Sequence, residues 1–94
     1  MSAGMTAVYD NKALSRFELE AEGGVAFAKY RLAPGMVVIT HTEVPRELRG
    51  RGIASTLVKG ALTLIRVDVL KVAARCGFVA AYLDKHTEEA DRVE

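Results

Sequence analysis

The segment at positions 46–55, RELRGRGIAS, combines three arginines with two glycines just before an apolar-periodic stretch that begins at Ile53. An α-helix leaves its first backbone N–H groups without internal partners, and a Ser, Thr, Asp or Asn normally precedes it to accept one of them. Leu48, Arg49 and Gly50 stand there instead. Free amides at the positive end of a helix dipole, next to glycines and arginines, are typical of a phosphate-binding site. The alternative is a loop capped by water, with its arginines solvated.

Two common phosphate-binding loops do not fit this segment. A P-loop needs G-x-x-x-x-G-K-[ST], and no such run occurs in the chain. A dinucleotide-binding turn needs G-x-G-x-x-G after a first strand, and here the third glycine is missing. The sequence therefore argues against a nucleoside triphosphatase and against a dinucleotide-binding enzyme.

Length and composition limit the other possibilities. We expect one domain over residues 1–94, with an ordered core from about residue 6 to 87. The net charge of +1 provides no overall field for a nucleic acid or an anionic membrane, so we expect neither as a partner. The single cysteine, Cys76, excludes an internal disulfide and a cysteine-built zinc site, and we expect no metal. A free thiol and the lack of a signal-peptide core predict a cytoplasmic protein.

The first half of the chain carries the two-residue alternation of half-buried strands. Apolar and charged residues alternate from position 14 to 21, so the charged side chains should face solvent. The dipeptide Gly23-Gly24 predicts a hairpin turn into a returning strand over Val25 to Leu32. Pro34-Gly35 predicts a second turn, and the apolar run from 36 to 40 predicts a central strand. We therefore expect an antiparallel meander of three strands.

The second half has helical periodicity. Apolar residues three and four positions apart predict a helix packed on the sheet, at Ile53, Leu57, Ala61, Leu64 and Ile65. The segment from Val69 to Cys76 is compatible with a strand or with a helix that ends at Gly77. The run from Phe78 to His86 predicts a last helix, with Phe78 and Tyr82 facing inward. The expected fold is a compact α+β sandwich in the order β-β-β-α-β-α, with helices on one or both faces of the sheet.

Two longer motifs resemble a known family. HTEVPRELRGRGIASTLVKGAL at positions 41–62 and LKVAARCGFVAAYLDKH at 70–86 are similar to the minimal YjdJ-type branch of the GNAT superfamily of acetyl-CoA-dependent N-acetyltransferases. The loop pattern of that family, R-x-x-G-x-A, is read at Arg49, Gly52 and Ala54. The resemblance covers about residues 14 to 87. It implies a GNAT-like fold with a mostly antiparallel central sheet, and it favours a strand for Val69 to Arg75.

The resemblance also implies how a coenzyme would bind. In that family the backbone amides of the loop hold the pyrophosphate of coenzyme A, and the preceding strand splays from its neighbour to admit the pantetheine arm. The residues that it assigns to coenzyme binding here are Val44, Arg49, Gly50, Arg51, Gly52, Ile53, Ala54 and Ser55. We therefore expect acetyl-CoA as the cosubstrate.

Acetyl transfer to an amine needs a base for the amine proton, a donor that polarises the thioester carbonyl, and a proton for the departing thiolate. The resemblance places the base at the end of the central strand, where His41 and Glu43 lie. Histidine titrates near neutrality without help, whereas a glutamate needs burial to raise its pKa into a useful range. If the strand continues, both side chains point to the same face. A backbone N–H near Val44 would polarise the carbonyl. The alternatives are a core histidine and a solvated carboxylate.

Two further candidates lie in the last motif. GNATs often protonate the leaving thiolate with a tyrosine of the last helix, and Tyr82 is the candidate here; the alternative is a tyrosine that anchors this helix to the sheet. Cys76, beside a thioester, could itself accept the acetyl group if its thiol pKa is lowered. The alternative is a cysteine that packs as a small apolar side chain.

The interval from position 8 to 17 is too short for the helices that larger GNATs insert over the acceptor side. We therefore expect an open acceptor site, which suits a large acceptor such as a protein lysine. The resulting hypothesis is an N-acetyltransferase in which an acceptor amine attacks acetyl-CoA directly. The alternatives are a non-catalytic coenzyme A or acetyl-CoA binding module, and a small interaction domain that binds no nucleotide.

Overall fold

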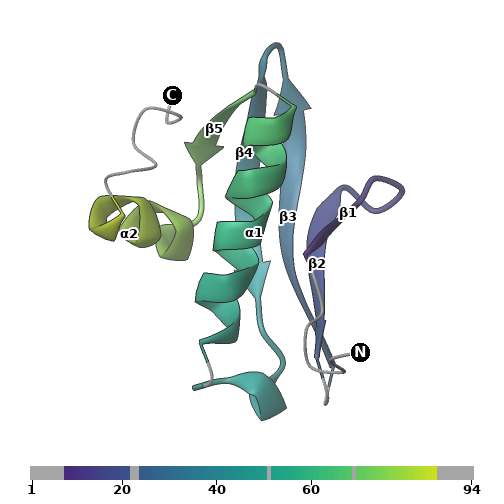
Figure 1. Cartoon of the computed structure of the whole chain (residues 1–94), viewed down its shortest axis with the longest axis vertical. Coiled ribbons are helices and arrows are strands. Elements are labelled where there is room, and N and C mark those ends of the chain that lie inside the picture. The colour runs from purple at the N-terminus through teal and green to yellow at the C-terminus, as the bar shows by residue number, and fades with distance from the viewer. Residues whose placement is uncertain (1–7, 22–23, 51, 69, 87–94) are drawn as a thin grey trace.

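The described part of the chain folds into one five-stranded sheet and two α-helices (Figure 1). The structure is a computed structural model that describes residues 8–21, 24–50, 52–68 and 70–86. Strands β1 to β4 are antiparallel neighbours in chain order, and β5 pairs parallel with β4. The elements are β1 (Tyr9–Asn11), β2 (Arg16–Ala21), β3 (Gly24–Ala33), β4 (Met36–Glu43), the 3-10 turn η1 (Arg46–Leu48), α1 (Ile53–Val67), β5 (Lys71–Ala74) and α2 (Gly77–Lys85).

Most of the predicted elements are confirmed. The three-strand meander, the helix from Ile53 and the last helix are all present. The ambiguous segment is strand β5, so the helical interpretation of it is wrong. The first hairpin differs in register, because Ala21 pairs with Gly24. Gly24 therefore belongs to β3, whereas residues 22 and 23 lie outside the described residues.

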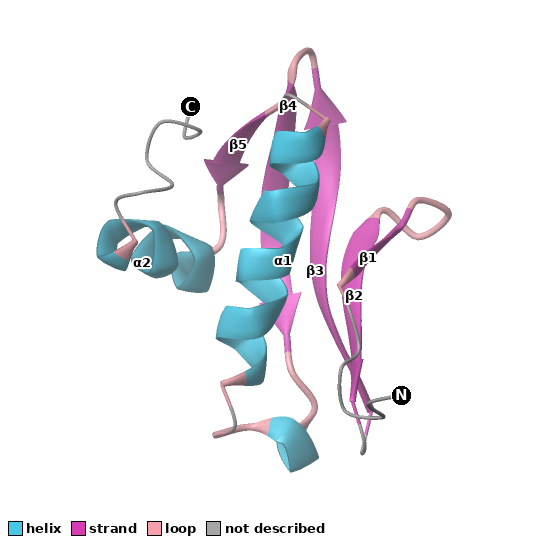
Figure 2. Cartoon of the chain, in the orientation of Figure 1, coloured by secondary structure: helices cyan, strands magenta, loops and turns pink. Residues whose placement is uncertain are grey.

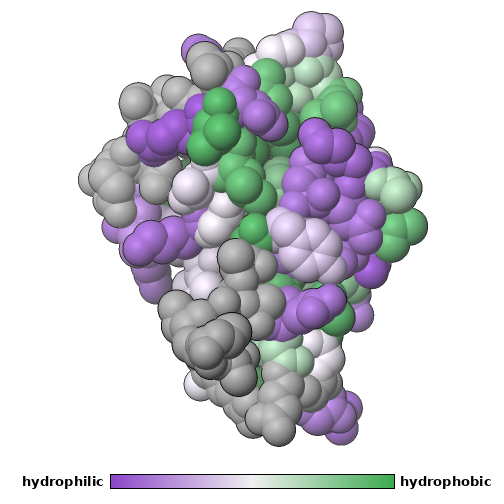
Figure 3. All heavy atoms as spheres, turned by 45° about the vertical axis from the view of Figure 1, so that its right-hand side comes forward, coloured by the Kyte–Doolittle hydropathy of each residue, from purple (hydrophilic) through white to green (hydrophobic). Residues whose placement is uncertain are grey.

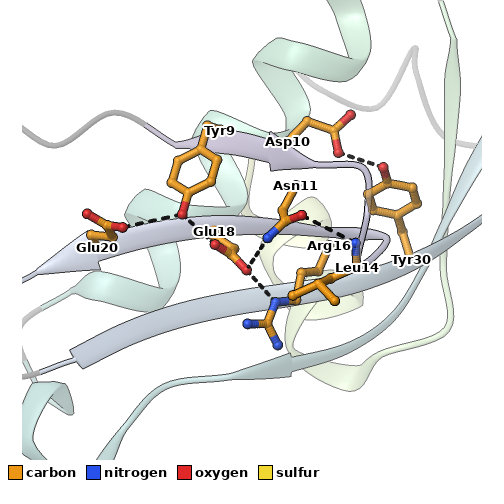
Figure 4. Close-up of polar contacts among 8 residues, drawn as sticks. All are labelled: Tyr9, Asp10, Asn11, Leu14, Arg16, Glu18, Glu20 and Tyr30. Carbon is orange, nitrogen blue, oxygen red and sulfur yellow. Dashed lines mark hydrogen bonds and ion pairs between the residues drawn. The ribbon is translucent and has the colours of Figure 1, made fainter.

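The sequence pattern did not predict strand β1, and this strand changes the environment of Glu18. The alternation in β2 placed Glu18 on a solvent-facing side, yet the residue is only 4% exposed. Tyr9 and Asn11 of β1 and Arg16 of β2 all donate hydrogen bonds to its carboxylate (Figure 4). The hydrogen bonds from Tyr9 and Arg16 lower the pKa of Glu18. Glu18 is thus an ionised carboxylate that joins β1 to the sheet.

Helix α1 covers one face of the sheet. Its fully buried side chains follow the predicted periodicity and pack on the inward side chains of β2, β3 and β4. The inner face of α2 adds to the same core cluster, so both helices serve one core. The strand residues that point the other way lie outside this cluster. We call this side the open face of the sheet; it is formed by Tyr9, Asn11, Arg16, Glu18, Glu20, Val25, Phe27, Lys29, His41 and Glu43.

The helices are too short for a membrane span. Within the described ranges, no helix combines the length and the apolar character that a crossing needs.

Gly60 lies in the middle of α1, where glycine normally weakens a helix by about 1 kcal/mol relative to alanine. A Cβ at this position would lie 2.4 Å from Val8 Cγ2 and 2.5 Å from Val8 Cβ. We therefore expect Gly60→Ala to lower the free energy of unfolding by about 1–2 kcal/mol, since overpacking outweighs the gain in helix propensity. Urea unfolding measures the change. In a Val8→Gly background the same substitution should be neutral or stabilising; equal destabilisation in both backgrounds would contradict this explanation.

Candidate functional site

The segment between β4 and α1 contains the short turn η1 and leads to the N-terminus of α1 (Figure 2). Gly52 is the N-cap residue of α1, with φ 72° and ψ 15° in the left-handed region, and among the described residues no side chain caps the first amides. Gly50 also has a positive φ, 83°. Glycine adopts such angles at little cost, and a Cβ at either position would meet no atom within 4 Å. The N-terminus of α1 is therefore open to a ligand from outside.

This loop lines a pocket of about 210 Å³. Leu48, fully buried, holds the base of the loop, while Arg49 donates from Nε to the Val44 carbonyl at 3.3 Å. Phe78, the second residue of α2, lines the opposite side. Of the residues assigned to coenzyme binding, the pocket includes Val44, Arg49, Gly50, Gly52, Ile53, Ala54 and Ser55. Arg51 lies outside the described residues.

The expectation that Phe78 faces inward is wrong. Phe78 is 40% exposed and borders this pocket, whereas Tyr82 and Leu83 carry the inner face of α2, each 7% exposed. The buried residues of α2 are Val79, Tyr82 and Leu83, spaced three and four positions apart, so Phe78 lies to the side of this stripe, against the α1 loop. The sequence carried only a weak signal for the pocket position of Phe78, because an aromatic residue in the first turn of a helix is equally compatible with packing in the core.

Strands β4 and β5 diverge beside this pocket. Their pairing ends at Ile39 and Ala74, although β4 continues to Glu43. The register between β3 and β4 also shifts there, because Lys29 pairs with His41 and Tyr30 with Ile39, which leaves Thr40 as the extra residue of a β-bulge. The edge of β4 from Thr40 onward is therefore not paired with β5, which ends at Ala74.

His41 and Glu43 lie at this end of β4, on the open face. His41 Nε2 is 3.1 Å from Glu43 Oε1, so the two side chains share one face, as expected if the strand continued. Their side chains are 56% and 57% exposed. His41 is thus not a core histidine, and Glu43 is a strand residue rather than part of a loop. The Phe27 ring, 6.5 Å from His41 between centroids, lies next to them.

Cys76 lies on the other side of β4, in a polar setting. It is the N-cap residue of α2, and its Sγ makes a hydrogen bond of 3.4 Å with Thr42 Oγ1. Burial works to raise the pKa of the Cys76 thiol, but Thr42 and the backbone N–H groups of Val79 and Phe78 outweigh it, and the pKa is lowered. These groups stabilise a thiolate at a helix N-terminus. Cys76 is therefore not a purely apolar packing residue. Sequence reasoning did not single out Thr42, although it lies between the two candidate bases.

We expect Thr42→Val to raise the pKa of Cys76. Valine keeps the shape of threonine but cannot donate a hydrogen bond to the thiolate, so alkylation by iodoacetamide should reach half its maximal rate at a higher pH. Thr40→Val is the matched control, because the Thr40 hydroxyl donates to the Lys29 carbonyl. An unchanged alkylation profile in Thr42→Val would contradict the role of Thr42.

Tyr82 lies in the core rather than at the surface of the site. Its ring stacks on His86 with 4.0 Å between centroids and 21° between planes. This burial supports the interpretation that Tyr82 anchors α2. His86 follows the last turn of α2, which contains Lys85, in keeping with cations at the negative end of a helix dipole. Among the residues that the structure describes, no three His, Cys, Asp or Glu side chains gather in a way that could hold a metal ion.

Comparison with known proteins identifies the family. The model of the GCN5-related N-acetyltransferases matches residues 16–92. The chain belongs to the GCN5-related N-acetyltransferase family. The fold is also similar to the solution structure of a GCN5-like protein from Staphylococcus aureus, with a TM-score of 0.73 and 24% identity over 99% of this chain and 91% of the other. The described loop and the divergence of β4 and β5 thus belong to a member of this family.

Curated relatives match a shorter part of the chain. Protein NATD1 from Gallus gallus and that from Mus musculus are each 39% identical over 51 residues, which are 54% of this chain and 46% of the relative. The human protein NATD1 is also 39% identical over 51 residues, 45% of its length. The match therefore spans slightly less than half of these relatives.

Proposed function

We propose that this protein is an acetyl-CoA-dependent N-acetyltransferase that transfers an acetyl group to an amine acceptor at an open site. The observation that carries the proposal is the uncapped N-terminus of α1 beside the separation of β4 from β5. The first would supply amide donors for a pyrophosphate, and the second would leave an unpaired edge of β4 for an extended thiol arm. Family membership supports the use of an acyl-CoA.

The loop would hold the coenzyme through its backbone. The amides after Gly52 would donate to the pyrophosphate, and the positive end of the α1 dipole would favour its charge. The positive φ of Gly50 and Gly52 shapes this loop, and the open space where their Cβ atoms would lie leaves room for a phosphate. Phe78 would contribute an apolar wall. Acetyl-CoA, when bound, supplies the acetyl thioester.

The acceptor amine would approach from the open face, where neither α-helix contributes to the packing. His41 and Glu43 lie there, 3.1 Å apart, and would be the candidates to take the proton that the amine loses. Glu43, 57% exposed, lacks the burial that a carboxylate base needs, so His41 is the favoured candidate. As the new C–N bond forms, the C–S bond breaks and the coenzyme leaves as a thiolate that takes up a proton. A backbone N–H near Val44, at the pocket edge, would polarise the carbonyl. Tyr82 is the family's candidate for protonating the leaving thiolate, but it is only 7% exposed, so the anchoring role fits its position better.

Cys76 offers a second route to the same products. Its thiolate would attack the thioester carbonyl, forming an acetyl-cysteine and releasing coenzyme A, and the amine would then take the acetyl group. The lowered pKa and the position across β4 from His41 support this role. Direct attack is the simpler route, because it needs one transfer instead of two.

The exposure of His41 and Glu43 favours a competing function, a coenzyme A or acetyl-CoA binding module without catalysis. One experiment tests both functions. The protein is given acetyl-CoA and a mixed library of lysine peptides; mass spectrometry measures peptide acetylation, and calorimetry measures the affinity for acetyl-CoA. We expect the double variant His41→Gln, Glu43→Gln to lose about 100-fold or more in transfer while keeping its affinity, since general-base catalysis contributes about that much.

Lys29→Gln is the matched control, because Lys29 lies opposite His41 on the same open face. It should keep both activity and affinity. Micromolar binding without transfer to any peptide would favour the binding module. Undetectable binding of both acetyl-CoA and coenzyme A would contradict both functions. Loss of transfer in Cys76→Ala, with an acetyl group trapped on Cys76 in the wild type, would favour the route through the cysteine.

A further inference from the structure

A second pocket, of about 180 Å³, lies at the opposite end of α1 from the coenzyme loop. It is bounded by the C-terminal turn of α1, the segment after β1 and the hairpin between β3 and β4. Because α1 has 15 residues, the two ends of the helix lie about 22 Å apart. The pocket is therefore separate from the proposed acetyl-transfer site. Its apolar walls are Phe17, Leu32, Val37, Leu64, Ile65 and Leu70.

The described polar lining of this pocket includes two carboxylates, the partly buried Asp10 and the exposed Asp68. Asp10 accepts a hydrogen bond of 2.5 Å from the Tyr30 hydroxyl, as Figure 4 shows. Asp68 is the C-cap residue of α1, and burial together with Asp10 and Asp68 raises the pKa of Tyr30. Tyr30 therefore stays protonated and keeps donating to Asp10. The negative end of the α1 dipole adds to the field of the two carboxylates.

Lys12 is the one basic residue among the described lining residues, and its ion pair with Asp10 is weak. Its Nζ lies 3.5 Å from Asp10 Oδ2, while the Lys12 side chain is 79% exposed and that of Asp10 only 21% exposed. An exposed ion pair at this distance contributes about 1 kcal/mol or less. A cationic ligand could therefore replace the Lys12 ammonium beside Asp10 at small cost.

Among the described lining residues the exposed ones are Lys12, Ser15, Leu32 and Asp68. Leu32, 68% exposed, contributes an apolar surface at the rim of the pocket. In Figure 3 a band of hydrophobic surface runs between hydrophilic regions on this side of the molecule. The site thus offers an apolar surface for a short carbon chain and carboxylates for a positive charge.

We propose that this pocket binds a small alkylammonium ion, with its ammonium group between Asp10 and Asp68 and its carbon chain against Leu32 and Leu64. The volume suits a ligand of a few non-hydrogen atoms rather than a large metabolite. The site does not depend on the proposed acetyl transfer, and its ligand is not the acetyl acceptor, because it lies at the far end of α1.

The test is an NMR titration of the full chain with isoamylamine, with isoamyl alcohol and isovalerate as neutral and anionic analogues of similar shape. We expect saturable shifts of amides around Tyr30 and Asp68 with the amine, about tenfold weaker binding of the alcohol, and none of the carboxylate. Equal affinity for the amine and the alcohol would overturn the proposal, and so would shifts that do not saturate.

Two variants test the charges. Asp68→Asn keeps the shape of the helix end and should weaken amine binding about tenfold. Lys12→Gln removes the competing ammonium and should strengthen it by about two- to threefold. Unchanged or weaker amine binding in Lys12→Gln would overturn the proposal, because neither a loss of structure nor a purely apolar pocket predicts a gain in affinity. Arg49→Glu, at the other end of α1, should leave amine binding unchanged, and the amide spectrum of each variant verifies its fold.

Discussion

Gly52→Asp should weaken acetyl-CoA binding by about thirtyfold or more while the protein stays folded. The left-handed φ of 72° at Gly52 is one that aspartate tolerates better than most residues, and its Cβ would meet no atom within 4 Å. The carboxylate would lie where a pyrophosphate is proposed to bind. Two charges about 4 Å apart repel by about 1 kcal/mol in water and by more near a protein surface, so two phosphate charges lose at least about 2 kcal/mol of binding free energy.

Gly52→Asn is the matched control for this prediction. Asparagine has the same shape and also tolerates left-handed angles, but it carries no charge. Calorimetric titration with acetyl-CoA and with coenzyme A should therefore show a much smaller loss for the Asn variant. Equal losses in the two variants would mean that the side chain blocks the loop sterically. Full binding by the Asp variant would place the coenzyme elsewhere and remove the main support for the proposed function.

Leu57→Ala should lower the free energy of unfolding by about 3–4 kcal/mol. Leu57 is completely buried in α1, where it packs within the core cluster between the helices and the sheet. Truncation of a buried leucine loses its transfer free energy and leaves a cavity, at a cost of about 2–5 kcal/mol. A domain is stable by only about 5–15 kcal/mol, so this single change removes a large share.

Lys59→Ala serves as the control, because Lys59 lies on the exposed side of the same helix. It should change the stability by less than about 0.5 kcal/mol. Chemical unfolding followed by circular dichroism measures both variants. A loss below about 1 kcal/mol in Leu57→Ala would mean that α1 does not pack on the sheet as described.

Periodicity and turn residues were sufficient to predict the elements of this fold whose partners are close in sequence. The spacing from Ile53 to Ile65 determined α1, since a helix buries residues three and four positions apart wherever its partner lies. The absence of a capping residue before Ile53 was also readable, and the structure has no side-chain cap there. For β5, periodicity left two readings open, and only the resemblance to a family favoured the strand.

The environment of two residues depended on segments that their own sequence pattern does not specify. Glu18 has the pattern of a solvent-facing residue, but it is covered by Tyr9 of a three-residue strand too short to be recognised by its alternation. Phe78 has the character of a core residue, but it lies beside the buried stripe of α2 and borders the pocket. The local sequence pattern indicates how apolar a position is, but it does not specify which segment of the chain covers that position.

The sequence pattern by itself determined strands β2, β3 and β4, the two helices and the uncapped loop. The resemblance to a family favoured β5 and pointed to His41 and Glu43 as candidate bases. Only the tertiary structure decided that β4 leaves β5 after Ile39, that Thr42 reaches Cys76 across 34 residues of chain, and that a pocket with Asp10 and Asp68 forms at the far end of α1. The physical reason is that hydrogen bonds and side-chain periodicity act locally, whereas a strand divergence, a thiol environment or a cavity exists only once separate segments have packed together.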